Sequence, residues 1–186
     1  HLNQPGLSAK KEGNTENALG KAAKKLEATY LLPYLYHATL EPMNCTAHVR
    51  QNQCDLWVPT QFQSGALTSA EKITGLKPEQ IHIHTPYLGG GFGRRAELDF
   101  VDEALQISKA TGKPIKLIWT REEDVKNDFY RPGNCCRIEA GLNQQGSIVA
   151  WSHKVVVPSI FARFFPQMVK DGIDPAAVEG ISDMEY

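Results

Sequence analysis

The stretch Gly89-Gly90-Gly91-Phe92-Gly93-Arg94-Arg95 stands between two segments of different periodicity. Before it, apolar and polar residues alternate from Ile81 to Tyr87, which predicts a strand. After it, residues 96–111 carry an apolar face at helical spacing, formed by Leu98, Val101, Leu105 and Ser108, and Gly112 is placed to end a helix. Residues 114–119 predict another strand, so the stretch is the loop of a β-α-β unit.

Upstream of this unit the pattern is mixed. Residues 1–13 are polar, and Asn14 is expected to cap a short helix that ends near Glu27. Residues 28–37 are β-prone, and Pro33 makes them an edge or bulged strand. Residues 47–58 predict a hairpin that turns near Asn52-Gln53, and Ser64 is expected to cap a helix that Gly75 ends.

Downstream, Thr120 is expected to cap a short acidic helix, and residues 136–141 and 148–157 predict a hairpin across 143–146. We therefore expect the α/β class (α+β mixed), with a mixed sheet and packed helices. The division is a linker and short helix over 1–27 and one incomplete domain over 28–186. The end at Tyr186, directly after Asp183-Met-Glu, favours a fragment.

Composition indicates a globular chain. The 186 residues are 41% hydrophobic and 22% charged, with a formal net charge of −1. This charge gives no reason to expect nucleic acid as a partner. No apolar run approaches the ~18 residues that would predict a transmembrane segment. Four cysteines, Cys45, Cys54, Cys135 and Cys136, are expected to be reduced and mostly buried, although a zinc site of Cys45, His48 and Cys54 is an alternative.

The glycine loop is the main candidate site. Four glycines in five residues allow backbone conformations closed to other residues and let a ligand approach the main chain. A helix beginning at Ala96 would add positive potential, and Arg94 and Arg95 would add charge, so we expect an anionic or oxygen-bearing ligand. The loop matches neither the P-loop nor the G-x-G-x-x-G fingerprint.

Other candidate residues carry weaker signals. His37 and Glu41 are alternative metal ligands, and Gln61 follows a strand end, where its amide can hydrogen-bond a ligand oxygen. His82 and His84 share one side of a strand, which favours a solvent-facing pair.

Four segments in this order resemble the molybdenum-cofactor subunit of the xanthine dehydrogenase and aldehyde oxidase family, and most closely its isoquinoline 1-oxidoreductase beta-subunit branch, which includes membrane-bound aldehyde dehydrogenases. They are His37-Ala-Thr-Leu-Glu-Pro-Met-Asn-Cys45, Trp57-Val-Pro-Thr-Gln61, Gly89-Gly-Gly-Phe-Gly-Arg-Arg95, and Thr120-Arg-Glu-Glu-Asp124 with Phe129-Tyr-Arg-Pro132. The likeness covers roughly residues 25–186. It implies part of a molybdopterin-binding domain, its first half.

The resemblance implies a molybdenum-dependent oxidoreductase that hydroxylates an aldehyde or N-heterocycle with oxygen from water. The implied cofactor is molybdopterin with molybdenum, as the cytosine dinucleotide, bound by Gln61, Gly90, Gly91, Phe92, Gly93 and Arg94. No protein metal ligand is expected, because the pterin sulfurs hold the metal. The implied partners are an iron-sulfur small subunit, which carries the clusters, a cytochrome c and a small-molecule substrate. The implied compartment is the periplasm or the membrane surface, and the cytoplasm is the alternative.

Two features depart from the family pattern. Arg94-Arg95 is typical of the isoquinoline branch, whereas other members continue with Gly-Lys or Gly-Arg. The family's general-base glutamate lies in a late glycine-rich segment that this chain lacks. We therefore expect no catalytic residue in the chain and no activity from the chain alone. The alternatives are a stand-alone module that binds a phosphate or nucleotide, and an assembly domain that uses an exposed aromatic stretch, 160–165.

Overall fold

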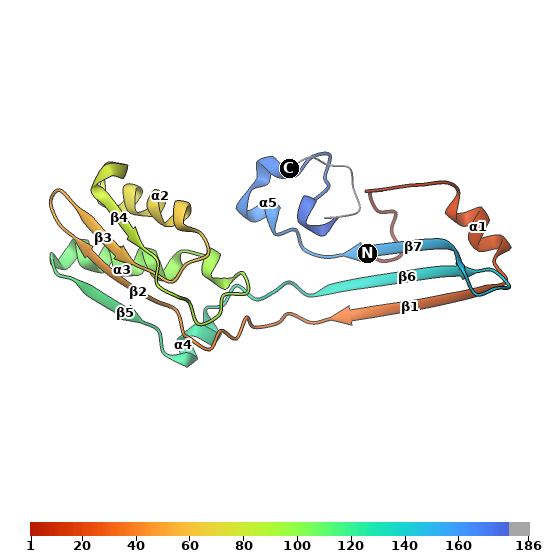
Figure 1. The fold of residues 1–186 in the computed structure, drawn as a ribbon, viewed down its shortest axis with the longest axis horizontal. Coiled ribbons are helices and arrows are strands. Elements are labelled where there is room, and N and C mark those ends of the chain that lie inside the picture. The colour runs from red at the N-terminus through yellow and green to blue at the C-terminus, as the bar shows by residue number, and fades with distance from the viewer. Residues whose placement is uncertain (179–186) are drawn as a thin grey trace. The chain divides into compact units, whose positions relative to one another are not determined.

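The computed structural model describes residues 1–178, which divide into two compact units (Figure 1). Unit 1 comprises His1–Leu35 and the chain from Pro132 onward, and unit 2 comprises Tyr36–Arg131. The expectation about the chain end at Tyr186 lies outside the described residues. The expected division at residue 27 stays a prediction.

Unit 2 is a four-stranded mixed sheet with helices. The strand order is β4-β3-β2-β5, where β3 and β4 are parallel and the other pairs antiparallel. The strands are β2 (Asn44–Val49), β3 (Cys54–Trp57), β4 (Ile81–His84) and β5 (Ile115–Ile118); the helices are α2 (Gln63–Thr74), α3 (Asp99–Thr111) and α4 (Arg121–Lys126). The 3-10 turns are η1 (Pro78–Gln80) and η2 (Arg94–Ala96).

The core of unit 2 lies between one face of this sheet and the helices α2 and α3. Burial alternates along β2, with Cys45, Ala47 and Val49 turned inward. The apolar face of α3 meets them with four buried side chains, Phe100, Val101, Ala104 and Leu105. This rigid layer supports the loops at the ends of β3 and β4.

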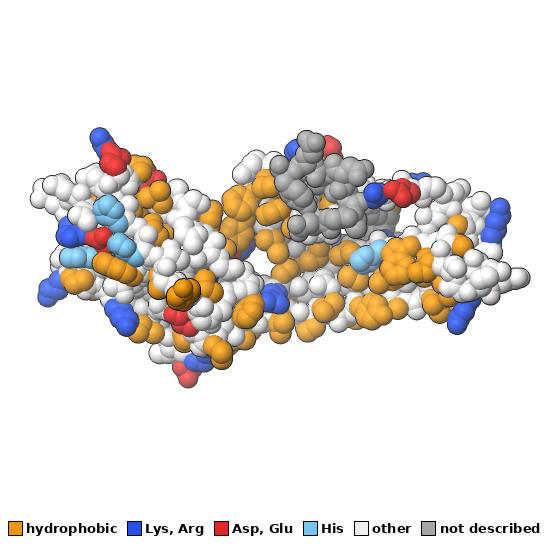
Figure 2. Space-filling view, in the orientation of Figure 1, with side chains coloured by type: hydrophobic (Ala, Val, Ile, Leu, Met, Phe, Trp, Pro, Cys, Tyr) orange, Lys and Arg blue, Asp and Glu red, His pale blue; other side chains and the backbone are white. Residues whose placement is uncertain are grey.

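Unit 1 is built on a three-stranded antiparallel sheet of order β1-β6-β7. Its strands are β1 (Lys24–Leu32), β6 (Asn134–Leu142) and β7 (Ile148–Val156); its helices are α1 (Thr15–Lys21) and α5 (Phe161–Phe164), with 3-10 turns η3 (Pro166–Met168) and η4 (Pro175–Ala177). Near α1, the Cβ position of Gly141 faces Ala22 and Leu19, so that helix covers part of one face. The alternate residues Leu26, Tyr30, Leu32, Trp151 and Val155 are 40–54% exposed, and apolar side chains line these strands in Figure 2.

The α/β class and both predicted hairpins are confirmed. In the turn of the first hairpin, Arg50 donates its backbone N–H to the Gln53 carbonyl at 2.9 Å. In the second, β6 and β7 pair across residues 143–147. Residues 28–37 were expected to form an edge strand, and β1 is an edge strand that ends just before Pro33. The helix capped by Thr120 is also present, since its hydroxyl accepts from the Glu123 N–H.

The first expected helix is too long. α1 begins after the Asn14 cap but ends at Lys21, and the predicted helical residues Lys24 to Glu27 belong to β1. Ala23 donates its N–H to the Leu142 carbonyl at 2.9 Å, which opens the pairing with β6. This distant strand outweighs the local helix propensity.

Three further boundaries differ from expectation. α2 begins at Gln63 after Phe62, so Ser64 lies inside the helix and does not cap it. β4 ends at His84, before Pro86, which has no N–H for a ladder. α3 begins at Asp99, because the turn η2 occupies Arg94–Ala96.

The predicted β-α-β unit is present in a split form. β4 and β5 flank α3 in the sequence but lie at opposite edges of the sheet. The neighbouring parallel strands are β3 and β4, which α2 connects. Because parallel strands end at the same edge, the loops that follow β3 and β4 are brought together, and this placement creates the candidate site.

Candidate functional site

The glycine loop after β4 has an unusual backbone. Gly90 and Gly93 have φ angles of 94° and 101°, and Phe92 has φ 53°. A side chain in this left-handed region carries strain, which persists mainly at functional sites. The Phe92 side chain is nevertheless 60% exposed, so burial of its ring does not explain the conformation.

The loop amides are only partly used by the protein. The Gly89 N–H donates to Glu41 Oε2 at 2.7 Å, the Gly93 N–H donates to Gln61 Oε1 at 3.0 Å, and the Arg94 N–H donates to the Gly91 carbonyl at 2.9 Å. Between them, the N–H groups of residues 90–92 have no hydrogen-bond acceptor within residues 1–178. These amides can serve an oxygen-bearing ligand.

Gln61, in the segment that follows β3, lies across this loop. A Cβ on Gly91 would sit 2.4 Å from Gln61 Oε1. Because the Gly93 N–H is a donor, the Gln61 atom that meets it must be the amide oxygen. The Gln61 NH₂ group is therefore left for a ligand, and the Gln61 N–H, bonded to the Arg95 carbonyl at 3.0 Å, fixes its backbone.

The expectation that Arg94 presents its charge to a ligand is wrong. Its side chain is 1% exposed and makes a two-pronged bond to Asp99, at 2.9 and 2.8 Å. Its guanidinium lies 5.3–5.9 Å from three ring centroids, those of Phe100, Trp119 and Phe129. A weakly hydrated, planar cation suits such an enclosure. Arg94 therefore stabilises the loop through contacts with the protein interior.

Arg95 is likewise turned inward, against expectation. Its fully buried side chain donates to the carbonyl of Gly90 at 2.7 Å and to that of Pro59 at 3.2 Å. It also bonds the Glu41 carbonyl and ion-pairs with the Glu41 carboxylate at 3.0 Å. Burial lowers the pKa of Arg95, opposed by the nearby Glu41 charge. Arg95 therefore joins the loop to the segment that carries Glu41.

The expected helix potential is also absent from the loop. α3 begins at Asp99 rather than Ala96, and Asp99 and Asp102 in its first turn already complement the helix dipole. The loop is thus an array of neutral donors.

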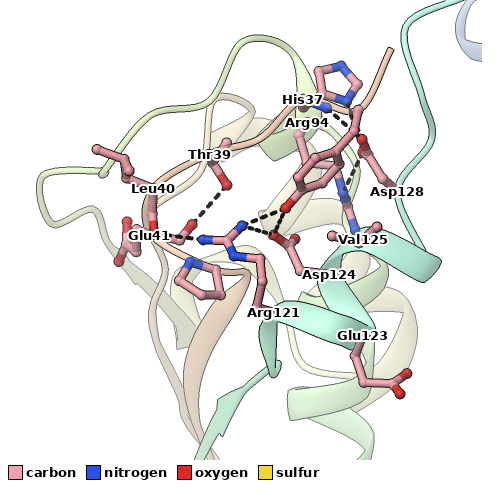
Figure 3. Close-up of polar contacts among 12 residues, drawn as sticks. His37, Thr39, Leu40, Glu41, Arg94, Arg121, Glu123, Asp124, Val125 and Asp128 are labelled. Atoms are coloured by element: carbon pink, nitrogen blue, oxygen red, sulfur yellow. Dashed lines mark hydrogen bonds and ion pairs between the residues drawn. The ribbon is translucent and has the colours of Figure 1, made fainter. Parts of the chain in front are cut away.

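His37 and Asp128 form a buried pair beside the loop (Figure 3). Asp128 accepts from the His37 backbone N–H at 2.7 Å and lies 2.8 Å from its ring Nδ1. The side chains are 10% and 0% exposed, and Arg94 Nε lies 3.3 Å from Asp128 Oδ1. His37 Nε2 is 3.7 Å from the Cβ position of Gly93. Sequence reasoning did not find Asp128, because nothing local marks this carboxylate as a partner.

A second buried carboxylate, Asp124 on α4, holds the same segment. Tyr36 donates its hydroxyl to Asp124, and Arg121 donates to Asp124 at 2.6 Å and to the Leu40 carbonyl at 2.8 Å (Figure 3). Burial, reinforced by Asp124, raises the pKa of Tyr36. Residues 36–41 are thus held by two carboxylates, Asp124 on α4 and Asp128 just after this helix.

An exposed cation does approach the loop. The Arg131 guanidinium lies 5.7 Å from the centroid of the Phe92 ring. In the sequence, Arg131 is marked only as part of the segment Phe129-Tyr-Arg-Pro132, one of those that carry the family resemblance.

The remaining candidates find partners within the protein. Glu41 bonds Gly89, Arg95 and Asn44, which replaces the metal-ligand alternative with a structural role. His84 stacks on Trp57 and pairs with Asp55 at 3.1 Å.

Other features of the described residues do not form a second candidate site. All four cysteines are free thiols, two buried and two half-buried, and no cluster of three or more metal-ligating side chains occurs within residues 1–178. No helix in that part of the chain is long and apolar enough to cross a bilayer. The aromatic stretch 160–165 is not the exposed patch expected, because its phenylalanines are half-buried and contact one another.

Comparison with known proteins gives a consistent result. Residues 2–159 match the molybdopterin cofactor-binding domain family. The isoquinoline 1-oxidoreductase subunit beta of Brevundimonas diminuta is 37% identical over 72% of this chain and 17% of its own length. The aldehyde oxidoreductase molybdenum-binding subunit PaoC of Escherichia coli is 32% identical over 82% of this chain and 21% of its own length.

Solved structures show the same fold. The aldehyde oxidoreductase of Desulfovibrio gigas superposes with a TM-score of 0.70 at 17% identity, over 84% of this chain and 18% of its own. The chain therefore spans about a fifth of the length of the relatives that it matches.

Proposed function

The chain belongs to the molybdopterin cofactor-binding domain family, and from this premise we propose that it forms one wall of the cofactor site in a molybdenum hydroxylase subunit. The observation that carries the proposal is the row of unused N–H groups at residues 90–92, next to the Gln61 side chain with its unpartnered NH₂. Such donors fit the oxygens of a molybdopterin cofactor. When bound, this group supplies the redox centre that accepts electrons from the substrate.

The proposed contacts follow from this geometry. Gln61, Gly90, Gly91, Phe92 and Gly93 bind the cofactor through the amide side chain and the main chain. Arg94 was first expected in the same set. We now propose that it stabilises the loop without contacting the cofactor, because its guanidinium is enclosed by Asp99 and aromatic rings. Arg131 is the cation on the ligand side.

The finer assignments are also proposals. By analogy with its relatives, the subunit oxidises an aldehyde or N-heterocycle with oxygen from water and uses the cytosine dinucleotide form. An iron-sulfur subunit and a cytochrome c would carry electrons away, at the periplasmic side. We expect no turnover from the chain alone, because the general-base glutamate is expected elsewhere in the subunit.

Gly91→Val in the full-length subunit tests the proposal. A valine side chain would collide with Gln61 and cover the free amides, so we expect molybdenum and pterin content to fall at least about tenfold, the equivalent of ~1.4 kcal/mol of binding. The control is Gly20→Val, because an added Cβ there has open space. Content would be measured by elemental analysis and by fluorescence of the oxidised pterin.

Two outcomes would contradict the proposal. The first is unchanged content in Gly91→Val protein that folds like the Gly20→Val control. The second is a thermal shift of the chain with simple nucleotides or inorganic phosphate together with no pterin in the subunit, which would favour a stand-alone phosphate-binding module.

A further inference from the structure

We propose that His37 forms a hydrogen bond through Nε2 with the ligand on the glycine loop, and that Asp128 is the residue that positions its ring. The inference rests on the proposed function and adds a side chain that the loop motif does not contain. Its basis is the pairing of His37 with Asp128 and the direction in which the rest of the ring points.

The pairing determines which ring nitrogen is available. Asp128 is buried and accepts from the His37 backbone N–H, while the ring Nδ1 lies 2.8 Å from its other oxygen. A carboxylate only accepts hydrogen bonds, so Nδ1 must carry a proton in this contact. Nε2 is then the ring nitrogen left for another partner.

The ring is aimed at the loop. Nε2 lies 3.7 Å from the Cβ position of Gly93, and the side chain is only 10% exposed. Nε2 has no hydrogen-bond partner within residues 1–178. Nε2 is therefore an accessible polar atom on a largely buried ring, and it lies beside main-chain amides that the protein leaves unused, where a ligand can reach both.

The carboxylate that orients the ring is itself held in place. Arg94 Nε lies 3.3 Å from Asp128 Oδ1, and the two side chains are 1% and 0% exposed. Buried groups of unit 2 therefore fix the position of Nε2 beside the loop amides.

A purely structural role is the competing explanation. Tyr36 holds residues 36–41 on α4, and His37 holds them on the segment after it, so a general loss of order would also impair ligand binding. Two substitutions separate the roles. Asn places its amide near the Nδ1 position and keeps the bond to Asp128, whereas Gln reaches the Nε2 position.

The test uses the full-length subunit with His37→Asn, His37→Gln and the surface control His82→Asn. We expect His37→Asn to keep the thermal midpoint of wild type but to retain roughly tenfold less molybdenum and pterin after dialysis. His37→Gln should retain more cofactor than His37→Asn, and His82→Asn should match wild type. Wild-type retention in His37→Asn would overturn the inference and leave the proposed function intact, whereas a wild-type subunit without molybdenum and pterin would overturn both.

A second measurement needs no cofactor. In the 186-residue chain labelled with ¹⁵N-histidine, the His37 resonances are identified by their loss in His37→Asn. We expect Nδ1 to be protonated, and Asp128→Asn to alter that signal. A neutral ring protonated at Nε2 alone would overturn the positioning by Asp128.

Discussion

Arg94 connects the glycine loop to the rest of unit 2 through buried charges. Its guanidinium pairs with Asp99 and Asp128, and the latter in turn holds His37. Removing Arg94 takes a charge partner from the fully buried Asp128 and from the partly buried Asp99, which costs more than the intact pairs contribute. The geometry of the loop thus depends on a residue whose own side chain is 1% exposed.

Arg94→Ala is therefore expected to lower the free energy of unfolding by about 3–5 kcal/mol. Arg94→Lys should lower it less, because the charge remains while the two-pronged geometry is lost. Urea unfolding followed by circular dichroism measures both. Lys126→Ala is the control, because its ion pair with Glu123 spans 3.8 Å at the surface and should change stability by less than about 1 kcal/mol. An Arg94→Ala protein as stable as the control would contradict the assigned role.

The contrast between Gln61 and Arg94 shows what sequence can predict at this scale. Gln61 was assigned to the cofactor site by the resemblance, and that role stays a prediction; in the structure its side chain accepts from the Gly93 N–H of the loop. Arg94 was misassigned, because two arginines after a glycine run have the same sequence whether they point outward or inward. The deciding partners, Asp128 and the rings of Trp119 and Phe129, are distant in the chain.

At the scale of elements, the periodicity of apolar residues predicted which face of a helix is buried better than it predicted where the helix begins and ends. Val101, Leu105 and Ser108 are buried on α3 as their spacing indicates. The first turn of that helix was misplaced, because the side chains of Arg94 and Arg95 require the intervening turn η2. α1 was overextended for a similar reason, since pairing between β1 and β6 is a tertiary effect.

The hairpin of β2 and β3 carries a prediction about pH. Burial raises the pKa of Cys45 to about 12, with Cys54 adding to the shift, and burial raises that of Cys54 to about 11, opposed by Arg50. The ordinary value is 9.0. Below pH 9.0, both thiols are protonated in the folded and in the unfolded chain. Above it, only the unfolded chain releases these protons, so stability falls as pH rises.

We expect the urea midpoint to decline between about pH 9 and 10, where these two thiols contribute. The decline should be shallower in the double variant Cys45→Ala, Cys54→Ala, whatever its stability at neutral pH. The control variant Cys135→Ala, Cys136→Ala retains both buried thiols and should keep the wild-type slope. Equal slopes in both double variants would show that the hairpin thiols are not responsible.

At the scale of the whole molecule, the sequence predicted the class and the local hairpins but not the two units. Unit 2 is a continuous segment, whereas unit 1 is assembled from both sides of it. The register of β1 on β6 sets Leu32 opposite Asn134, so the chain leaves and re-enters unit 1 at neighbouring points. Such a connection suits an inserted segment that folds by itself.

The distribution of buried side chains supports the same conclusion. Within the described residues, the buried apolar side chains lie between Met43 and Trp119, apart from Ala140, Ala150 and Pro175 in unit 1. Unit 2 therefore holds a core, while the sheet of unit 1 has large apolar side chains still exposed, such as Tyr30 and Trp151. The residues of the candidate site, from His37 to Arg131, all belong to unit 2.

We therefore expect residues 36–131 to fold alone with a cooperative urea transition, because the core and the buried charge network are complete within them. Trp119, which is 8% exposed, reports this transition by fluorescence once Trp57 is replaced by Phe. In the whole chain, Trp151 as the only tryptophan should report an earlier transition of unit 1. Phe100→Ala in the fragment is the destabilising control, with an expected loss of about 3–5 kcal/mol. A fragment without a cooperative transition, or coincident transitions at both probes, would show that the two units depend on each other for stability.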